Sequence, residues 1–315
     1  MGSTSMIICI GTTPTAQRTM FFDRLVPGEV NRAAAVFETA SGKSINVALV
    51  LRALGEGAIA SGFLGGPRGA FIRTRLDELG IRHHFITTAV PTRLCTTVID
   101  RAGGTTTELV EESLPLSEDD WQNMRRMVWQ LLGLGSMLVL SGSLPPGAPQ
   151  DFYRYCIEAA AKEGIESIID GRGEPLRQSL PLRPLLVKPN RSELAGMFEL
   201  SIQSEAELKD AAKRLTDMGA RWALITMGRE GALLTDGTDC WRITPPAIEA
   251  VNAIGSGDSM TAGVAVALRQ GKSMLDATVF GTACAAANAL TQTTADVRPA
   301  DVERLLGGVR VESVG

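Results

Sequence analysis

The sequence has 315 residues, of which 44% are hydrophobic and 21% charged, and its formal net charge is −4. This composition is that of an ordinary globular protein, and the length suits one large α/β domain with an appendage or two small domains. Because Lys and Arg form no basic block, binding to a nucleic-acid backbone is not expected.

The cysteines, the histidines and the N-terminus exclude further classes. The five cysteines are widely spaced, which excludes C-x-x-C metal or redox sites and fits a reducing compartment. Neighbours on a strand point to opposite faces, so His83 and His84 are not expected to share a metal. No basic segment followed by an apolar run marks a signal peptide, and no stretch is long enough for a membrane helix. We therefore expect a cytoplasmic protein.

The N-terminal part of the chain combines two kinds of predicted structure. Strands and helices alternate in the order strand 6–10, helix 44–54, strand 58–66 and helix 70–80. Residues 82–112 then form short segments rich in Thr and β-branched residues, with a glycine turn near 101–104. They predict a small antiparallel sheet, with which residues 13–39 can pair.

Helices and strands alternate regularly after residue 117. Helices are predicted at 117–132, 150–162, from about 192, 204–218, 256–270 and 274–290. Strands are predicted at 136–142, 166–170, 184–190 and 222–228, with a hairpin at 232–243. This rhythm predicts an α/β fold with a mostly parallel sheet and helices on both faces.

Gly42-Lys43-Ser44 has the ending of a nucleotide-binding P-loop, G-x-x-x-x-G-K-[ST]. The first glycine of that motif would stand where the chain has Phe37, and the residues before Gly42 resemble the end of a strand. A P-loop is therefore not expected. Gly42 opens an apolar helix instead, and the N-terminus of a helix can bind an anion.

Polar, glycine-rich stretches follow several predicted strands. They lie at 141–147, 170–174, 188–193 and 226–231. Because ligands bind beyond the carboxyl ends of parallel strands, four such stretches at one edge predict a site there.

The strongest candidate for chemistry is Gly255-Ser256-Gly257-Asp258, which precedes a long helix of small residues. The glycines allow several N–H groups to point at one spot, and the helix N-terminus adds positive potential, which together suit a transferring phosphoryl group. Asp258 can accept the proton of an attacking hydroxyl. If the acceptor already carries a phosphate, Lys43 is a suitable point charge and Arg93 a second cation, although a surface role for Arg93 fits the sequence equally well.

These motifs resemble the PfkB (ribokinase-like) carbohydrate kinases over essentially the whole chain, and most of all their 1-phosphofructokinase and tagatose-6-phosphate kinase branch. The two family signatures are matched by SGKSINVALVLRALG and VNAIGSGDSMTAG. Intervening blocks are matched by GFLGGPRGAFI, TTTELVEE, SGSLPPGAPQDFY, KPNRSEL and TMGREGALL. Several spaced motifs in the right order are far more specific than one.

The resemblance implies a doubly wound α/β kinase domain over residues 1–315, with a small β-sheet lid formed by about 13–39 and 91–112. It implies transfer of the γ-phosphate of ATP to a sugar hydroxyl. The implied roles are Asp258 as base; Gly255, Ser256 and Gly257 as anion hole; Gly42, Lys43, Asn46, Arg93, Ser141 and Gln17 near the acceptor; Lys188, Asn190, Thr226 and Gly228 at the nucleotide; and Asn190 with Glu193 at Mg²⁺, largely through water.

Some positions depart from the family. Gln17 replaces an Asp that contacts sugar hydroxyls, and Gln both donates and accepts hydrogen bonds where a carboxylate only accepts. Ser44 replaces a usual Gly, Val110 a usual Asn beside the sugar, and Asn252-Ala253 a pair that is typically Asp or Ser followed by Thr. The departures concern sugar recognition more than the catalytic end.

The expected function is ATP- and Mg²⁺-dependent phosphorylation of a phosphorylated ketohexose, foremost fructose 1-phosphate. Tagatose 6-phosphate or another sugar of the family is the first alternative, and a sugar-phosphate-binding protein without turnover is the second. A dinucleotide-dependent oxidoreductase is disfavoured because no G-x-G-x-x-G follows the first strand. A homodimer formed through the lid is expected by analogy with the family. No nucleic-acid or membrane partner is expected.

Overall fold

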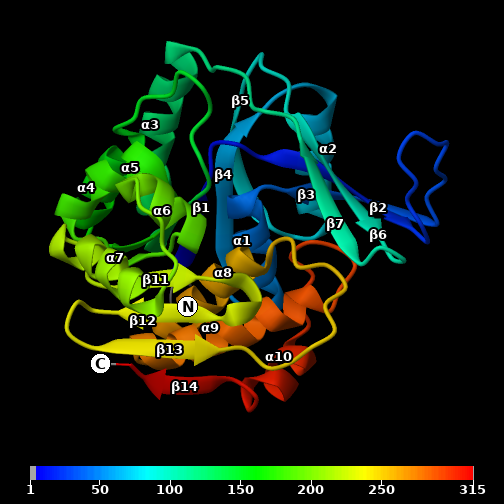
Figure 1. The fold of residues 1–315 in the computed structure, drawn as a ribbon. Helices are drawn as coiled ribbons and strands as arrows, with labels where there is room; N and C mark the ends of the chain where they lie inside the picture. The colour runs from blue at the N-terminus through cyan, green and yellow to red at the C-terminus, as the bar shows by residue number, and fades with distance from the viewer. Residues whose placement is uncertain (1–4, 315) are drawn as a thin grey trace.

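The computed structural model describes residues 5–314, which form one large and one small β-sheet with helices packed around them (Figure 1). The large sheet contains β1 (Met6–Ile10), β4 (Ala58–Leu64), β5 (Arg82–Thr87), β8 (Gly135–Ser141), β9 (Glu166–Asp170), β10 (Leu186–Val187), β11 (Ala223–Thr226), β12 (Ala232–Thr235), β13 (Cys240–Thr244) and β14 (Arg310–Ser313). Their spatial order is β14-β13-β12-β11-β10-β9-β8-β1-β4-β5. The strands from β11 to β5 pair in parallel, and β12, β13 and β14 are added antiparallel. The predicted mostly parallel sheet is confirmed.

Helices cover both faces of the large sheet. They are α1 (Lys43–Ala53), α2 (Gly66–Glu78), α3 (Glu118–Leu132), α4 (Phe152–Lys162), α5 (Gly173–Ser179), α6 (Arg191–Phe198), α7 (Glu205–Asp217), α8 (Ser256–Arg269), α9 (Met274–Ala289) and α10 (Pro299–Leu306). Successive side chains of β1 point to opposite faces of the large sheet. Ile7 and Cys9 belong to the apolar core formed with α1, α2 and α8–α10. Ile8 and Ile10 belong to the core formed with α3–α7. Since the sheet is buried on both faces, its central strands are almost wholly apolar.

The close approach of α8 and α9 helps to fix the start of α8. A Cβ atom on Gly263 of α8 would lie 2.8 Å from the Cα atom of Gly281 on α9, so neither position leaves room for a side chain. Asp258, in the first turn of α8, is therefore carried by a rigidly packed helix.

The small sheet has the order β3-β2-β6-β7 and lies beside α2, at one end of the large sheet (Figure 1). Its strands are β2 (Thr15–Phe22), β3 (Ala35–Ser41), β6 (Arg93–Asp100) and β7 (Thr105–Val110). The pairs β2–β3 and β6–β7 are antiparallel, but the central pair β2–β6 is parallel. The predicted small antiparallel sheet is confirmed in its two hairpins, and the structure adds that these hairpins join side by side through parallel first strands.

Other differences concern segments with weak sequence signals. Residues 82–87 do not belong to the small sheet: β5 follows α2 and pairs in parallel with β4, as the third part of a β-α-β unit. Its Thr and β-branched residues resemble those of the small sheet because it is a half-exposed edge strand. The helices α5 and α10 and the edge strand β14 were not anticipated.

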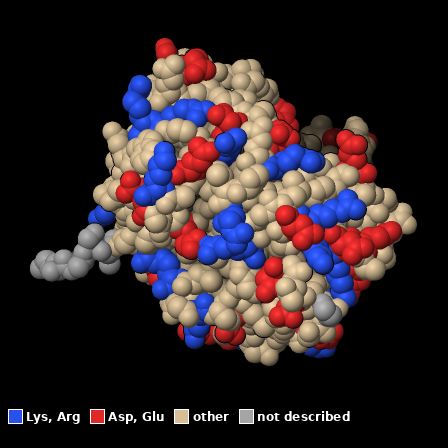
Figure 2. All heavy atoms as spheres, turned by 90° about the vertical axis from the view of Figure 1, so that its left-hand side faces the viewer, with Lys and Arg blue, Asp and Glu red and all other residues tan. Residues whose placement is uncertain are grey.

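On the face shown in Figure 2, acidic and basic side chains are interspersed. Ion pairs at the protein surface include Arg125–Asp151 and Arg154–Glu158. Within residues 5–314, none of the helices is both long and apolar enough to span a bilayer.

Candidate active site

A cavity of about 380 Å³ lies where the ends of the central large-sheet strands meet the small sheet. Its wall comes from segments far apart in the chain: strands β2, β6 and β7, the start of α1, the loop after β10 and the start of α8. The predicted site residues in this wall are Gln17, Gly42, Lys43, Asn46, Arg93, Lys188, Asn190, Glu193, Thr226, Gly255, Gly257 and Asp258. The two family signatures thus meet in one place.

Three other predicted residues lie next to this cavity but not in its wall. Ser141 is buried at the end of β8, and its hydroxyl has no hydrogen-bond partner among the described residues. Gly228 opens a short 3-10 turn and lines a neighbouring cavity of about 520 Å³. The Ser256 hydroxyl accepts a hydrogen bond from Asn288 Nδ2 at 3.1 Å.

The segment that ends like a P-loop has a different structure. Residues before Gly42 form β3, and Gly42, with a φ of 110°, is the N-cap of α1. Lys43 is the first residue of that helix. As predicted, this segment is a strand followed by a helix N-terminus and not a phosphate-wrapping loop.

The start of α8 combines an anion site with a carboxylate. Gly255, the N-cap, has a φ of 85° and a ψ of 0°, a left-handed conformation that favours glycine. The first N–H groups of a helix have no acceptors within the helix, and the helix dipole gives this end positive potential. Because Gly255, Gly257 and Asp258 all line the cavity, a negatively charged group placed there would meet these N–H groups beside a proton acceptor.

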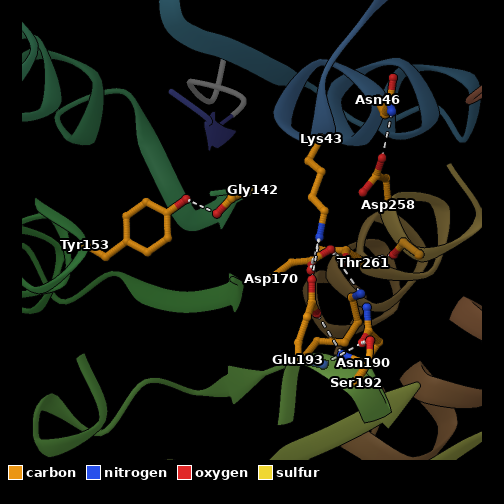
Figure 3. A network of polar contacts seen from close by, with 12 residues as sticks. Lys43, Asn46, Gly142, Tyr153, Asp170, Asn190, Ser192, Glu193, Asp258 and Thr261 are labelled. Carbon is orange, nitrogen blue, oxygen red and sulfur yellow. Dashed lines mark hydrogen bonds and ion pairs between the residues drawn. The ribbon is translucent and has the colours of Figure 1, made fainter. Parts of the chain in front are cut away.

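Asp258 is buried and accepts a hydrogen bond from Asn46, whose Nδ2 lies 2.7 Å from Oδ2 (Figure 3). Burial raises the pKa of Asp258 to about 6, and the negative charge of Asp170 acts in the same direction. Lys43, the hydrogen bond from Asn46 and Lys188 oppose the rise. A carboxyl group whose pKa is close to neutrality is well matched to the task of a general base.

Asp170, at the end of β9, lines the cavity and forms ion pairs with two lysines. Its Oδ1 lies 2.9 Å from Lys43 Nζ and its Oδ2 lies 3.0 Å from Lys188 Nζ. Burial alone would raise the pKa of Asp170, but the two ammonium groups outweigh it and hold the pKa below its usual value. The carboxylates of Asp170, Asp258 and Glu193 in turn raise the pKa of Lys43 against the effect of burial, so Lys43 stays charged.

Asn190 and Glu193 form a reciprocal cap at the start of α6. Asn190 Oδ1 accepts hydrogen bonds from the Glu193 N–H (2.8 Å) and from Ser192 Oγ (2.7 Å), while Glu193 Oε2 accepts from the Asn190 N–H (2.9 Å). The second carboxylate oxygen, Glu193 Oε1, lies 4.0 Å from Lys43 Nζ. Glu193 therefore retains an oxygen suited to a hard cation, whereas the amide oxygen of Asn190 is already used in capping.

The small sheet supplies the opposite wall. Gln17 is buried and donates from Nε2 to Thr97 Oγ1 at 2.8 Å. Arg93 donates to backbone carbonyls, including that of Thr13 at 3.1 Å, and forms no ion pair among the described residues. Burial raises the pKa of Glu108, an effect that Arg93 opposes. Arg93 is thus a cation of the site whose charge is available to a ligand.

Sequence reasoning missed several residues of this site. Asp170 and Ser41 are joined by hydrogen bonds to Lys43 and Asn46, respectively, and Glu108 and Cys95 line the wall. The only signal for Asp170 was its place at the start of a polar stretch that follows a buried strand. Ser41 and Glu108 lie within the matched blocks SGKSINVALVLRALG and TTTELVEE but were given no role there, and Cys95 lies in a strand outside the matched blocks.

Comparisons with known proteins agree with this geometry. Residues 4–301 match the pfkB family carbohydrate kinases. A 1-phosphofructokinase of Borreliella burgdorferi is 37% identical over 276 residues, which are 87% of this chain and 88% of the relative. The structure of phosphofructokinase-2 from Escherichia coli in complex with potassium is similar with a TM-score of 0.87 and 27% identity, covering 96% of this chain and 98% of that one. A possible 1-phosphofructokinase of Thermotoga maritima shares the fold with a TM-score of 0.91 at 21% identity, covering 98% and 100% of the two chains. The chain belongs to the pfkB family of carbohydrate kinases.

Proposed function

We propose that this kinase transfers the γ-phosphoryl group of ATP to fructose 1-phosphate, at the hydroxyl far from the existing phosphate, and so forms fructose 1,6-bisphosphate. The observation that carries the proposal is the meeting of Asp258, the N-terminus of α8 and Arg93 in one cavity. They supply a base, an anion site and a cation, respectively. The 1-phosphofructokinase named above as a relative supports this choice of acceptor.

In the proposed mechanism, Asp258 accepts the proton of the attacking hydroxyl through one carboxylate oxygen while Asn46 holds the other. The free N–H groups at the start of α8 stabilise the negative charge of the transferring group. The small sheet acts as a lid, with the boundaries predicted from the sequence, and its closure excludes water that would otherwise hydrolyse ATP.

The contacts favour different roles for the two cations. Arg93 forms no ion pair among the described residues and suits the phosphate that the acceptor already carries. Lys43 lies between Asp170 and Glu193, 2.9 Å and 4.0 Å from their oxygens, which places its charge closer to the reacting end. We infer that Lys43 acts mainly on the transferring phosphoryl group and Arg93 mainly on the acceptor phosphate.

ATP and Mg²⁺ complete the proposal. Lys188, Asn190, Thr226 and Gly228 are proposed nucleotide contacts, and Glu193 Oε1 is proposed to meet the metal directly or through water. Because residues 5–314 hold no cluster of three or more His, Cys, Asp or Glu side chains suited to a metal, Mg²⁺ would take its remaining ligands from water and phosphate oxygens. When bound, it would neutralise charge on the phosphates.

The setting of the enzyme follows by analogy. We propose a cytoplasmic kinase that pairs with a second copy through its small sheet. Phosphofructokinase-2 of Escherichia coli has a tetrameric inhibited form, so assemblies beyond a dimer occur among structures of this fold. Size-exclusion chromatography with light scattering would decide between them.

The function is tested by ADP release with ATP and Mg²⁺ against fructose 1-phosphate, fructose 6-phosphate, tagatose 6-phosphate, fructose and ribose. We expect fructose 1-phosphate to have the highest kcat/KM. If tagatose 6-phosphate had the highest kcat/KM, the kinase would be a tagatose-6-phosphate kinase instead. If an unphosphorylated sugar had the highest kcat/KM, the proposal of a phosphorylated acceptor would be refuted. The variant Asp258→Asn should lose turnover by about 10²–10⁴-fold while fructose 1-phosphate still raises its melting temperature. Unchanged turnover would remove Asp258 as the base.

A further inference from the structure

A chain of three buried polar side chains leads from the small sheet to the start of α8. Ser41, the last residue of β3, donates from Oγ to Asn46 Oδ1 at 2.9 Å. Asn46, on α1, donates from Nδ2 to Asp258 Oδ2 at 2.7 Å (Figure 3 shows this second contact). Ser41 and Asn46 are each only 4% exposed, and Asp258 is 5% exposed. Elements distant in the sequence are thus connected by two hydrogen bonds.

The direction of this chain follows from hydrogen-bond chemistry. An ionised carboxylate only accepts, so the amide nitrogen of Asn46 has to face Asp258 and its oxygen has to face Ser41. Among the described residues, the Ser41 hydroxyl is the donor to that side-chain oxygen. With the amide turned over, two oxygens would face each other at Asp258. The carboxylate therefore selects the orientation in which Asn46 donates to it, and the Ser41 hydroxyl, which can donate or accept, holds this orientation by donating to Asn46 Oδ1.

We propose that Ser41 is a positioning residue of the phosphoryl-transfer site: it holds the amide of Asn46 so that Asp258 keeps one carboxylate oxygen hydrogen-bonded and the other free for the acceptor hydroxyl. The proposal rests on the role of Asp258 as base in the proposed function. It adds that Ser41, which lines the same cavity, governs through Asn46 how well that base is oriented and ionised.

The charges around Asp258 come from several elements and stay in place when Ser41 is altered. Lys43 from α1 and Lys188 after β10 favour the ionised form of Asp258, and Asp170 of β9 opposes it. Arg93 and Glu108 line the wall contributed by the small sheet. Glu193 on α6 faces Lys43. Since the hydrogen bond from Asn46 lowers the pKa of Asp258, weakening it should raise that pKa without any change in the surrounding charges.

The test compares pH profiles of kcat/KM for wild type, Ser41→Ala and Ser41→Thr, with fructose 1-phosphate as acceptor. In Ser41→Ala the acidic limb of the kcat/KM profile should move to higher pH by about half a pH unit to one pH unit. Compared with wild type, kcat/KM should then be several-fold lower at pH 6 and nearly unchanged at pH 8. Ser41→Thr keeps the hydroxyl and should restore the wild-type limb. The matched control is Ser179→Ala, which removes another buried hydroxyl, one that donates to the Pro175 carbonyl. Because Ser179 is distant in the sequence from both Ser41 and Asp258, this variant should leave the acidic limb of the pH profile in place.

A second readout separates this proposal from the proposed function. Carbon-13 NMR of the Asp258 carboxyl group, assigned by its loss in Asp258→Asn, follows the titration without any substrate. A higher midpoint in Ser41→Ala, restored in Ser41→Thr, would support the positioning role even if fructose 1-phosphate were not turned over. An unchanged midpoint, or an equal shift in Ser179→Ala, would overturn it. Turnover by Asp258→Asn would instead count against the proposed base.

Discussion

The carboxylate of Asp170 offers the sharpest test of what holds this site together. It is 1% exposed and contacts two ammonium groups, at 2.9 Å from Lys43 and 3.0 Å from Lys188. The substitution Asp170→Asn keeps the size of the side chain and removes its charge. Both lysines then lose their ion-pair partner, but in different surroundings. The side chain of Lys43 is 37% exposed and retains Glu193 at 4.0 Å, whereas that of Lys188 is 3% exposed and is left in a dry environment.

The expected loss of stability comes mainly from Lys188. Two unit charges 3 Å apart attract each other by roughly 5 kcal/mol at an effective dielectric constant of about 20, before desolvation is counted. Removal of one partner of a buried pair costs about 3–5 kcal/mol, because the remaining charge stays buried without compensation. The contribution of Lys43 is smaller, since water can solvate its exposed part. We therefore expect Asp170→Asn to lower the free energy of unfolding by about 3–5 kcal/mol.

Urea unfolding followed by circular dichroism at pH 7.5 measures this loss. The double variant Asp170→Asn/Lys188→Met removes both charges and should recover at least about 2 kcal/mol. The matched control Glu158→Gln breaks an exposed pair with Arg154 and should cost less than about 1 kcal/mol. A loss of less than about 1 kcal/mol for Asp170→Asn, or a double variant no more stable than the single one, would refute the reasoning.

The pH dependence of this effect has a definite sign. The folded-state pKa of Asp170 is held below its unfolded value of 3.8, so the stability that it contributes is present above pH 3.8 and is lost as the pH falls through the folded pKa. The contribution of the Asp170 charge itself should therefore be constant near neutral pH, where Asp258 is ionised as well, and be lost only below about pH 4.

Three further predictions concern individual side chains. Arg93→Ala should raise KM for the phosphosugar at least about tenfold, whereas Lys43→Ala should mainly lower kcat. Steady-state kinetics with varied phosphosugar and with varied ATP measure both effects. If the two effects were exchanged, the roles proposed for Arg93 and Lys43 would be contradicted. Gln17→Met should raise KM for the phosphosugar and leave KM for ATP unchanged, and an equal effect on both would place Gln17 outside the acceptor site. Asp258→Asn should be more stable than wild type by about 3 kcal/mol at pH 7.5. The reason is that the folded-state pKa of Asp258, about 6, lies about two units above the unfolded value of 3.8, so the wild type loses stability as the pH rises through 6. Urea unfolding at pH 7.5 and at pH 4 should show the gain in stability only at the higher pH.

Much of the fold could be predicted because its central strands and helices carry strong periodic signals. The strands β1 and β4 are wholly buried and β8 is buried from residue 137 on, and all three consist mostly of apolar residues. The helices α3 and α7 have both the helical period and a capping residue, at Ser117 and Ser204 respectively. The half-exposed edge strand β5 was assigned to the wrong sheet, because its residue types do not reveal its partner. Strand pairing is decided by the β-α-β connection through α2 rather than by composition.

The site was predictable to the extent that its residues stand next to helix N-termini. Gly42, Lys43 and Asp258 were found because glycines and polar residues mark these helix starts, whereas Asn190 was assigned a role only through the resemblance to the pfkB kinases. Asp170 was not singled out, because a single Asp at a strand end is common and its importance arises only when Lys43 and Lys188 reach it. Ser41 was missed for the same reason: its partner Asn46 is close in sequence, but the orientation that joins them is set by the packing of α1 against the sheet.

The environments of Asp170 and Asp258 show how two carboxylates a short way apart can take opposite roles. Both are buried, so burial raises both pKa values. Asp170 has an ammonium group at each oxygen and remains ionised, whereas Asp258 has a neutral amide as its only side-chain hydrogen-bond donor among the described residues and titrates near 6. The ionised Asp170 raises the pKa of its neighbour, while it keeps Lys43 and Lys188 charged and in place. Carboxyl groups whose pKa values are driven apart in this way mark the division between a counter-ion and a base. The ionisation of Asp258 thus costs free energy that the surrounding charges compensate only in part, which is the property expected of the proposed base.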